Sequence, residues 1–126
     1  MKFTAICENH LFSKAYTKGK RAVTSALAVY ILPDYKAKVL AKSHPEKITV
    51  NRIGITTSTK LGGAVVRSRA RRIIRAGLSS LERDKPLKTG YLIVIAARSA
   101  ATTLKSQDIR KHLDTAFTRL DMYKTV

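Results

Sequence analysis

Apolar and polar positions change their spacing several times along the chain, and each change marks a predicted element. Residues 25–32 alternate, so that Leu27, Val29 and Ile31 fall on one side of a strand and other mostly apolar residues on the opposite side. Because both sides are apolar, we expect this strand to be covered on at least part of each face. Pro33 ends the strand, since proline cannot donate to a sheet ladder.

Two further apolar runs predict strands. Residues 48–57 form the first, and Gly54 inside it marks either a bulge or a close approach to the backbone. Residues 91–96 are almost continuously apolar, which is typical of a central buried strand. Between the two earlier strands, residues 37–41 favour a short additional strand that turns back through residues 43–47.

Helical spacing appears near both ends of the chain. Asn9 is a good N-cap and Gly19 a good stop for a helix over residues 10–18, in which Phe12 and Tyr16 are four positions apart and lie on one side. The second helix is predicted over residues 106–123. Its apolar side consists of Ile109, Leu113, Phe117 and Leu120.

The longest predicted helix covers residues 64–81, directly after Gly62 and Gly63. At about 100° per residue, its apolar stripe consists of Val66, Ala70, Ile73, Gly77 and Leu81. The opposite side carries Arg71, Arg72 and Arg75, and its two flanks carry Arg67 and Arg69. This helix can therefore bury one face and present several guanidiniums outward.

The predicted elements follow the order α-β-β-β-α-β-α. This order predicts an α+β fold, a two-layer α/β sandwich in which helices pack on a mixed central sheet of about four strands. With 126 residues, of which 44% are hydrophobic, the chain has the length for one domain over residues 1–126 with a substantial core.

Charge distinguishes one part of this domain from the rest. The formal net charge is +17, from 25 Lys and Arg against 8 Asp and Glu. From Lys47 to Leu81 there are eight basic residues and no acidic one. Like charges repel one another and destabilise the compact state, so this run predicts a polyanionic partner, and nucleic acid is the simplest one.

Several classes of function lack support in the sequence. The single Cys7 forms no internal disulfide, and His10, His44 and His112 lack metal-ligand spacing. The acidic residues are spread singly, so neither a catalytic site nor a metal site is predicted. No apolar run approaches the roughly 20 residues of a membrane span. We therefore expect a cytoplasmic protein with no membrane partner and no required protein partner.

Residues 52–75 carry a resemblance to a known family. They read Arg-Ile-Gly-Ile-Thr-Thr-Ser-Thr-Lys-Leu-Gly-Gly-Ala-Val-Val-Arg-Ser-Arg-Ala-Arg-Arg-Ile-Ile-Arg. This stretch resembles the signature of the bacterial ribonuclease P protein component. That signature joins an Arg-x-Gly strand, a Ser-Lys-Lys-x-Gly-Asn-Ala-Val turn and an Arg-Asn-Arg-x-Lys-Arg helix. Elsewhere the resemblance is weaker and rests on Phe12, Tyr16, Gly19 and Tyr30.

Four positions depart from the family's pattern. Thr59 stands where the family has a lysine, and Gly63 and Ser68 stand where it has asparagines. A serine lacks the second donor and the reach of an asparagine amide, so any contact made by that amide is in doubt at Ser68. Arg71 replaces a lysine and should preserve phosphate binding, because its planar fork contacts phosphate bidentately.

The resemblance implies a function and its partners. It implies the protein subunit of ribonuclease P, with a ribosomal-protein-S5-domain-2-like fold, which promotes endonucleolytic maturation of tRNA 5′ ends. The implied partners are the ribonuclease P catalytic RNA and precursor tRNA. In this family the RNA cuts the phosphodiester and holds Mg²⁺, so the protein is expected to supply no catalytic residue and no metal ligand.

The resemblance also implies two groups of site residues. The group expected to contact the catalytic RNA is Lys60, Arg67, Ser68, Arg69, Arg71, Arg72 and Arg75. The group expected to form a cleft for the single-stranded 5′ leader, where aromatic rings stack on unpaired bases, is Phe12, Tyr16, Tyr30 and Arg52. Two other functions stay open: a small basic ribosomal or rRNA-binding protein without a role in cleavage, and a ribonuclease that needs no RNA subunit.

Overall fold

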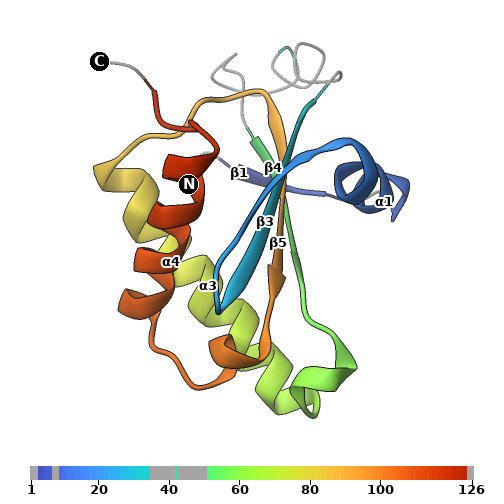
Figure 1. Cartoon of the computed structure of the whole chain (residues 1–126), viewed down its shortest axis with the longest axis vertical. Coiled ribbons are helices and arrows are strands. Elements are labelled where there is room, and N and C mark those ends of the chain that lie inside the picture. Colours follow the sequence, from blue (N-terminus) through green and yellow to red (C-terminus); the bar gives the residue numbers. More distant parts are fainter. Residues whose placement is uncertain (1–2, 7–8, 35–41, 43–50, 125–126) are drawn as a thin grey trace.

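A mixed sheet in the order β1-β4-β5-β3-β2 forms the frame of the molecule (Figure 1). The computed structural model describes residues 3–6, 9–34, 42 and 51–124. Within them the strands are β1 (Phe3–Ala5), β2 (Lys20–Val23), β3 (Leu27–Pro33), β4 (Asn51–Thr56) and β5 (Tyr91–Ala97). The β1–β4 and β4–β5 pairs are parallel, whereas β5–β3 and β3–β2 are antiparallel.

Helices cover both faces of this sheet. Figure 1 shows α3 (Ala64–Asp84) and α4 (Ser106–Arg119) on one face and α1 (Asn9–Lys18) on the other. Two short 3₁₀ helices, η1 (Thr59–Leu61) and η2 (Ser99–Thr102), lie at the ends of β4 and β5. α3 is the crossover that parallel pairing of β4 and β5 requires.

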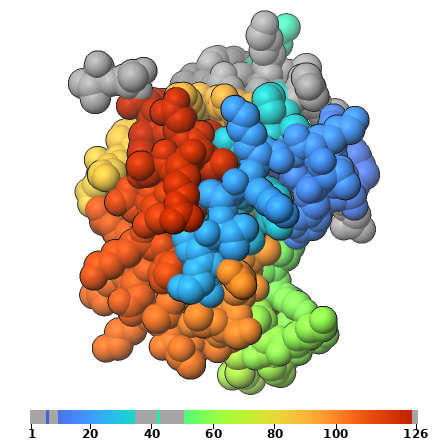
Figure 2. Space-filling model, viewed as in Figure 1, coloured from blue at the N-terminus to red at the C-terminus, as the bar shows by residue number. Residues whose placement is uncertain are grey.

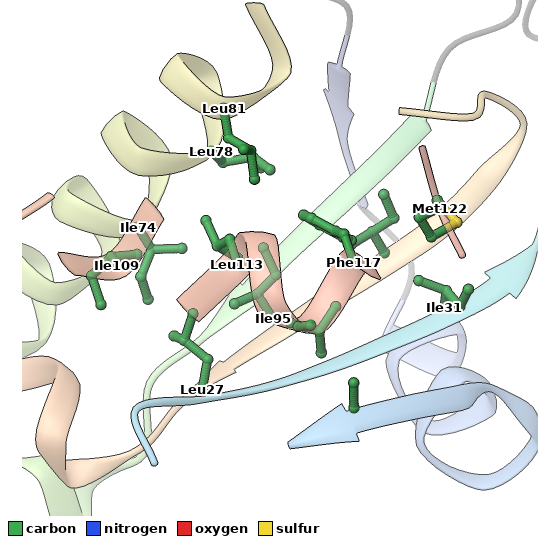
Figure 3. Packing of buried hydrophobic residues seen from close by; sticks show 14 of the residues in the cluster. Leu27, Ile31, Ile74, Leu78, Leu81, Ile95, Ile109, Leu113, Phe117 and Met122 are labelled. Carbon is green, nitrogen blue, oxygen red and sulfur yellow. The ribbon is translucent and has the colours of Figure 1, made fainter. Parts of the chain in front are cut away.

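Two buried clusters hold the layers together, one on each face of the sheet. The larger joins β3 and β5 to α3 and α4, and its largest side chains include Leu27, Ile74, Leu78, Ile95, Ile109, Leu113 and Phe117 (Figure 3). The smaller lies under α1 and consists of Ile6, Leu11, Ala15, Leu32, Leu92 and Val94. Alternate residues of β3 and β5 thus enter opposite clusters, which confirms the expectation that the strand over residues 25–32 is covered on both faces.

The predicted α+β class with helices on a mixed sheet is confirmed, and the sheet has one more strand than the predicted number. Because α1 covers the second face, there are three layers rather than the two predicted. Neither edge strand was predicted, because β1 has only three residues and three of the four residues of β2 are exposed. Such strands carry no apolar alternation. The additional strand predicted at residues 37–41 lies outside the described residues. No helix in the described part of the chain is long and apolar enough to cross a membrane.

The buried stripe of α3 is rotated relative to the prediction. Its buried residues include Ile74 and Leu78, whereas Val66 is 37% exposed and Ile73 is only partly buried. The rotation follows from packing against α4. The two helices approach most closely at Gly77, where an added Cβ would lie only 3.0 Å from the Ser106 carbonyl oxygen of α4. The helix also continues to Asp84, three residues beyond the predicted end.

The last helix ends earlier than predicted, at Arg119 rather than at residue 123. Leu120 is its C-cap, and Asp121 turns the chain with a φ of 54°. The following residues then pair with the loop after α3 through a bridge between Leu87 and Tyr123. The ring of Tyr123 meets that of Phe117 edge-on, with 6.4 Å between ring centroids, so this tail closes the larger cluster.

The tail contains a hydrogen bond that makes stability depend on pH. The Tyr123 hydroxyl donates to Asp114, and this bond lowers the pKa of the Asp114 carboxyl below its ordinary value, with help from Lys85 Nζ at 3.2 Å. Burial raises the pKa of Tyr123, which keeps the donor protonated. A carboxyl with a lowered folded-state pKa stabilises the fold above its unfolded pKa, and that contribution is lost as pH falls through the folded pKa.

We therefore expect Tyr123→Phe to reduce the free energy of unfolding near neutral pH and to matter less in acid. Urea unfolding at several pH values measures this. The difference between the wild type and Tyr123→Phe should shrink as pH falls below about 4, where an aspartate begins to be protonated. A difference that stays constant between pH 7 and pH 2.5 would contradict the charged hydrogen bond as its cause.

Candidate nucleic-acid interface

An aromatic surface lies where α1 crosses the sheet. The rings of Tyr16 and Tyr30 meet edge-on, with 4.8 Å between centroids and an interplanar angle of 88°. This geometry is one of the two that aromatic pairs favour. Tyr16 is 41% exposed, and its hydroxyl shares a hydrogen bond of 3.1 Å with Thr56 Oγ1 at the end of β4. Two of the rings assigned to the leader cleft are therefore in contact, and the Tyr16 ring stays open to a ligand.

Phe12 is positioned by the glycine of β4. A Cβ on Gly54 would overlap the Phe12 ring, so the ring can lie on the strand only because residue 54 has no side chain. β4 pairs with β5 in unbroken register from Arg52 to Thr56. Of the two explanations offered for Gly54, the close approach is therefore confirmed and the bulge is wrong. Phe12 itself is half-buried and packs on the smaller cluster, so Tyr16 is the more exposed ring.

A cation that sequence reasoning did not select completes this surface. Arg21 of β2 is the direct cross-strand partner of Tyr30, so both side chains point to the α1 face of the sheet. Arg21 is exposed. We define the aromatic surface as Phe12, Tyr16, Arg21, Tyr30 and Thr56. It combines stacking rings with one positive charge, which is the pairing used for single-stranded nucleic acid.

Arg52 does not occupy the exposed position that was expected for it. It is 5% exposed, and its guanidinium makes two hydrogen bonds to the Asp34 carboxylate, from Nε at 2.7 Å and from Nη2 at 2.9 Å. The expectation of an open Arg52 beside the aromatic rings is corrected accordingly. Its charge is offset within the fold by a buried carboxylate, and the exposed Arg21 is better placed to meet a phosphate.

The arginines of α3 point in three directions rather than all outward. Arg69 donates to the carbonyl oxygens of Thr102 (3.0 Å) and Leu104 (3.3 Å), so its guanidinium fastens α3 to the segment after η2. Arg67 continues the buried row of Ala70 and Ile74 by one turn, and its Nε is buried with no partner among the described residues. Both arginines are only partly buried, which agrees with the flank positions predicted for them, and Arg69 also bonds within the fold.

The remaining polar residues of this region form an exposed basic surface. Arg72 and Arg75 are exposed, and Arg71 Nη1 donates to Thr57 Oγ1 at 2.7 Å while its Nη2 reaches Ser68 Oγ at 3.2 Å. Lys60, also exposed, lies in η1, where its amide is capped by Ser58 Oγ. We define the arginine surface as Lys60, Ser68, Arg71, Arg72 and Arg75. Of the seven residues predicted to contact RNA, Ser68 is hydrogen-bonded to Arg71 and lines a shallow pocket with Arg69 and Arg72.

Two consecutive threonines join the two surfaces. Thr56 contacts Tyr16 of the aromatic surface, and Thr57 contacts Arg71 of the arginine surface. Figure 2 shows that α1 (blue) and the segment that leads into α3 (green) both lie on the right-hand side of the molecule. The end of β4 thus connects α1 to α3, and the two predicted groups are parts of one continuous region. Sequence reasoning missed both threonines, although strand alternation at the end of an apolar run predicts that successive side chains point to opposite faces.

The departure at Gly63 affects the start of α3. Gly63 is the N-cap of the helix, without a side-chain hydrogen bond to the first turn, and a Cβ there would meet open space. An asparagine at this position would fit and would cap the helix. The glycine therefore leaves the first amides of α3 without a side-chain cap.

The described residues contain no group of three or more His, Cys, Asp or Glu side chains that could hold a metal ion. The exposed part of the region carries arginine, lysine, hydroxyl and aromatic groups. These groups bind phosphates and bases, and none is paired with a carboxylate or imidazole in a general acid–base arrangement.

The fold and this region define a class of protein: a small, strongly basic α+β domain with an aromatic and an arginine surface joined at one strand end. Residues 2–121 match the family model described as Ribonuclease P. The chain belongs to the ribonuclease P protein family. Membership implies processing of tRNA 5′ ends as the protein component of an endoribonuclease, in partnership with ribonuclease P RNA.

Related sequences and structures agree with this assignment. The chain is 34% identical over 119 residues to the ribonuclease P protein component of Clostridium acetobutylicum, covering 94% of this chain and 90% of that one. It is 32% identical over 111 residues to that of Clostridioides difficile, with 88% and 86% covered. Among solved structures, the Staphylococcus aureus RNase P protein superposes with a TM-score of 0.72 at 22% identity, covering 98% and 99% of the two chains. The Thermotoga maritima protein gives 0.65 at 17% identity, with 88% and 92% covered.

The contact between Gly54 and Phe12 can be tested by adding one methyl group. We expect Gly54→Ala to lower the free energy of unfolding by about 1–3 kcal/mol, the usual cost of overpacking, because the Phe12 ring must move. The same change in a Phe12→Ala background should cost clearly less. Urea unfolding of the four proteins gives the coupling energy. Equal costs in both backgrounds would show that the ring does not depend on this glycine.

Proposed function

We propose that the chain binds the catalytic RNA of ribonuclease P through the arginine surface and the single-stranded 5′ leader of precursor tRNA through the aromatic surface. By holding both RNAs it promotes endonucleolytic removal of the leader. The observation that carries this proposal is the contact of Thr56 with Tyr16 and of Thr57 with Arg71. One strand end thereby supports both surfaces, so a bound leader and a bound RNA subunit would lie next to each other.

The charges support an arrangement in which the protein joins two polyanions. Arg72 and Arg75 are exposed and lie in a stretch, from Lys47 to Leu81, without any acidic residue. Bringing a precursor to an RNA subunit opposes negative charge with negative charge, and cations between them lower that cost. Arginine suits the task because its guanidinium contacts phosphate bidentately and also stacks on bases.

In this proposal the RNA subunit carries out the cleavage and holds the Mg²⁺ ions. The protein's part is to raise the affinity for the precursor and to favour metal binding indirectly through its positive charge. A direct test is cleavage of a precursor tRNA by a bacterial ribonuclease P RNA at low Mg²⁺, with and without this chain. Stimulation is expected, whereas cleavage by the chain without any RNA subunit would contradict the proposal.

Tyr16 provides the test of the leader contact. We expect Tyr16→Ala to weaken binding of precursor tRNA to the assembled enzyme by about 1–3 kcal/mol, or roughly 5- to 150-fold, because one stacked base loses its ring. Binding of mature tRNA, which lacks a leader, should hardly change. Titration of labelled precursor and mature tRNA with the holoenzyme measures both.

Arg21→Gln gives a second reading of the same surface without removing a ring. It should weaken precursor binding and make that binding less dependent on salt, with mature tRNA again unaffected. If either substitution weakened both RNAs equally, the aromatic surface would not be the leader site.

Arg72 provides the test of the contact with the catalytic RNA. We expect Arg72→Gln to weaken assembly and to make log K against log salt shallower by about 0.9, the value for one lost phosphate contact with a duplex. Assembly titrations from about 50 to 200 mM monovalent salt give the slope.

Arg83→Gln is the matched control for Arg72→Gln. Arg83 is an exposed arginine on the same helix, eleven residues further along and about 16 Å away at 1.5 Å per residue. Its removal subtracts the same charge and should leave the slope unchanged. Equal slopes for both variants would mean that overall charge, not the arginine surface, governs assembly.

A further inference from the structure

A second basic site lies away from the interface described above. The C-terminal end of α4, the end of α1 and the β2–β3 edge of the sheet enclose a cavity of about 270 Å³. Three lysines line it: Lys18 from α1, Lys20 from β2 and Lys88 from the loop before β5. Figure 2 shows β2 (blue) beside the red end of α4 on the face turned to the reader.

The lysines give this cavity a net positive charge. Lys18 and Lys20 are exposed, and neither has a carboxylate partner among the residues that the structure describes. Lys88 Nζ lies 3.5 Å from Asp121 Oδ2, but the Asp121 side chain is 93% exposed. An exposed ion pair of this kind is weak and easily exchanged. Three cations thus face one solvated carboxylate.

Apart from the three lysines and Asp121, the residues that line the cavity are apolar or aromatic. Pro33 and Tyr91 are cross-strand partners and form one wall, with Tyr91 only partly buried. Leu120 and Met122, which follow α4, also line the cavity, and because Met122 is almost fully buried, Leu120 presents more surface. A ligand that fits here must combine a flat or apolar body with an anionic group at the lysines.

The cavity lies at the opposite end of the sheet from the arginine surface. β3 and β5 pair from Leu27 with Ala97 to Pro33 with Tyr91, and the cavity is at the second end. Thr56, which leads towards α3, pairs with Ala96 at the first end. Tyr91 and Ala96 are five positions apart on β5, or roughly 17 Å at 3.3 Å per residue. The same phosphate therefore cannot occupy both sites.

We propose that this cavity binds one nucleoside 5′-monophosphate, with the base against Pro33, Tyr91 and Leu120 and the phosphate at the lysines. Its volume is close to the lower limit of about 300 Å³ for ligand sites, which suits a single nucleotide and excludes a duplex. The nucleotide can come from solution or from an unpaired position of an RNA chain. The inference does not depend on the proposed function of the arginine and aromatic surfaces.

Titration of the ¹⁵N-labelled full chain with AMP, followed by amide chemical shifts, tests the site. Adenosine and inorganic phosphate at the same concentration are the controls, because each supplies half of the ligand. We expect saturable shifts at Lys20, Tyr91 and Met122 with AMP, and much weaker ones with either control. Absence of shifts at these residues, or equal shifts with phosphate alone, would overturn the proposal.

Two substitutions sharpen the test, one that removes a positive charge from the cavity and one that removes a negative charge. Lys20→Gln should raise the Kd for AMP by up to about fivefold, the equivalent of one exposed charge contact. Asp121→Asn should lower the Kd, and asparagine tolerates the positive φ of residue 121. Lys111→Gln, on an exposed position of α4, is the control and should change nothing. If Lys20→Gln and Lys111→Gln acted alike, the lysines would be a diffuse charge and the proposal would fail.

A 5′-phosphorylated oligoadenylate distinguishes the two sources of the nucleotide. If it shifts the same three amides as AMP, the site accepts a nucleotide within an RNA chain. If AMP alone does so, the site takes free nucleotide. Both results support nucleotide binding in the cavity. Neither depends on whether Tyr16 and Arg72 contact RNA. A failure of the precursor or assembly titrations would therefore contradict the proposed function and leave this inference intact.

Discussion

Burial of β5 on both of its faces is the constraint on which the rest of the structure depends. Leu92 and Val94 pack towards α1, and Ile93 and Ile95 pack towards α3 and α4, each at 2% exposure or less. A strand of this kind must be covered on both sides, so helices are required on both faces of the sheet. α1 and α3 therefore approach the end of the neighbouring strand β4 from opposite faces. The candidate interface lies where they do so.

The positive charge of the chain has more than one physical role. Two arginines form hydrogen bonds within the fold. Arg52 donates to the Asp34 carboxylate, and Arg69 donates to the carbonyl oxygens of Thr102 and Leu104. Arg72 and Arg75 stay exposed, and neither forms an ion pair among the residues that the structure describes, so their charges repel one another. The basic motif thus combines arginines that bond within the fold with arginines that stay exposed. Exposure and hydrogen-bond partners separate the two kinds.

The sequence was most informative where local rules and packing agree. The run at residues 91–96 predicted the central strand, and Gly54 predicted either a bulge or a close approach, of which the Phe12 ring makes the second. It was least informative at the edges, because β1 and β2 owe their existence to hydrogen bonding with longer strands rather than to an apolar pattern. Arg21 could not be selected for the same reason: its proximity to Tyr30 is a matter of strand register.

By itself, the sequence determined the α+β class, the principal helices and strands, the strong positive charge and the resemblance to the ribonuclease P protein family. These depend on spacing along the chain and on residue types, which are local properties. Only the tertiary structure decided the rotation of α3, which its contact with α4 sets, and the burial of Arg52. It also decided the junction at Thr56 and Thr57. The aromatic and arginine surfaces come from distant parts of the sequence, and they meet because these two successive side chains point to opposite faces, Thr56 towards Tyr16 and Thr57 towards Arg71.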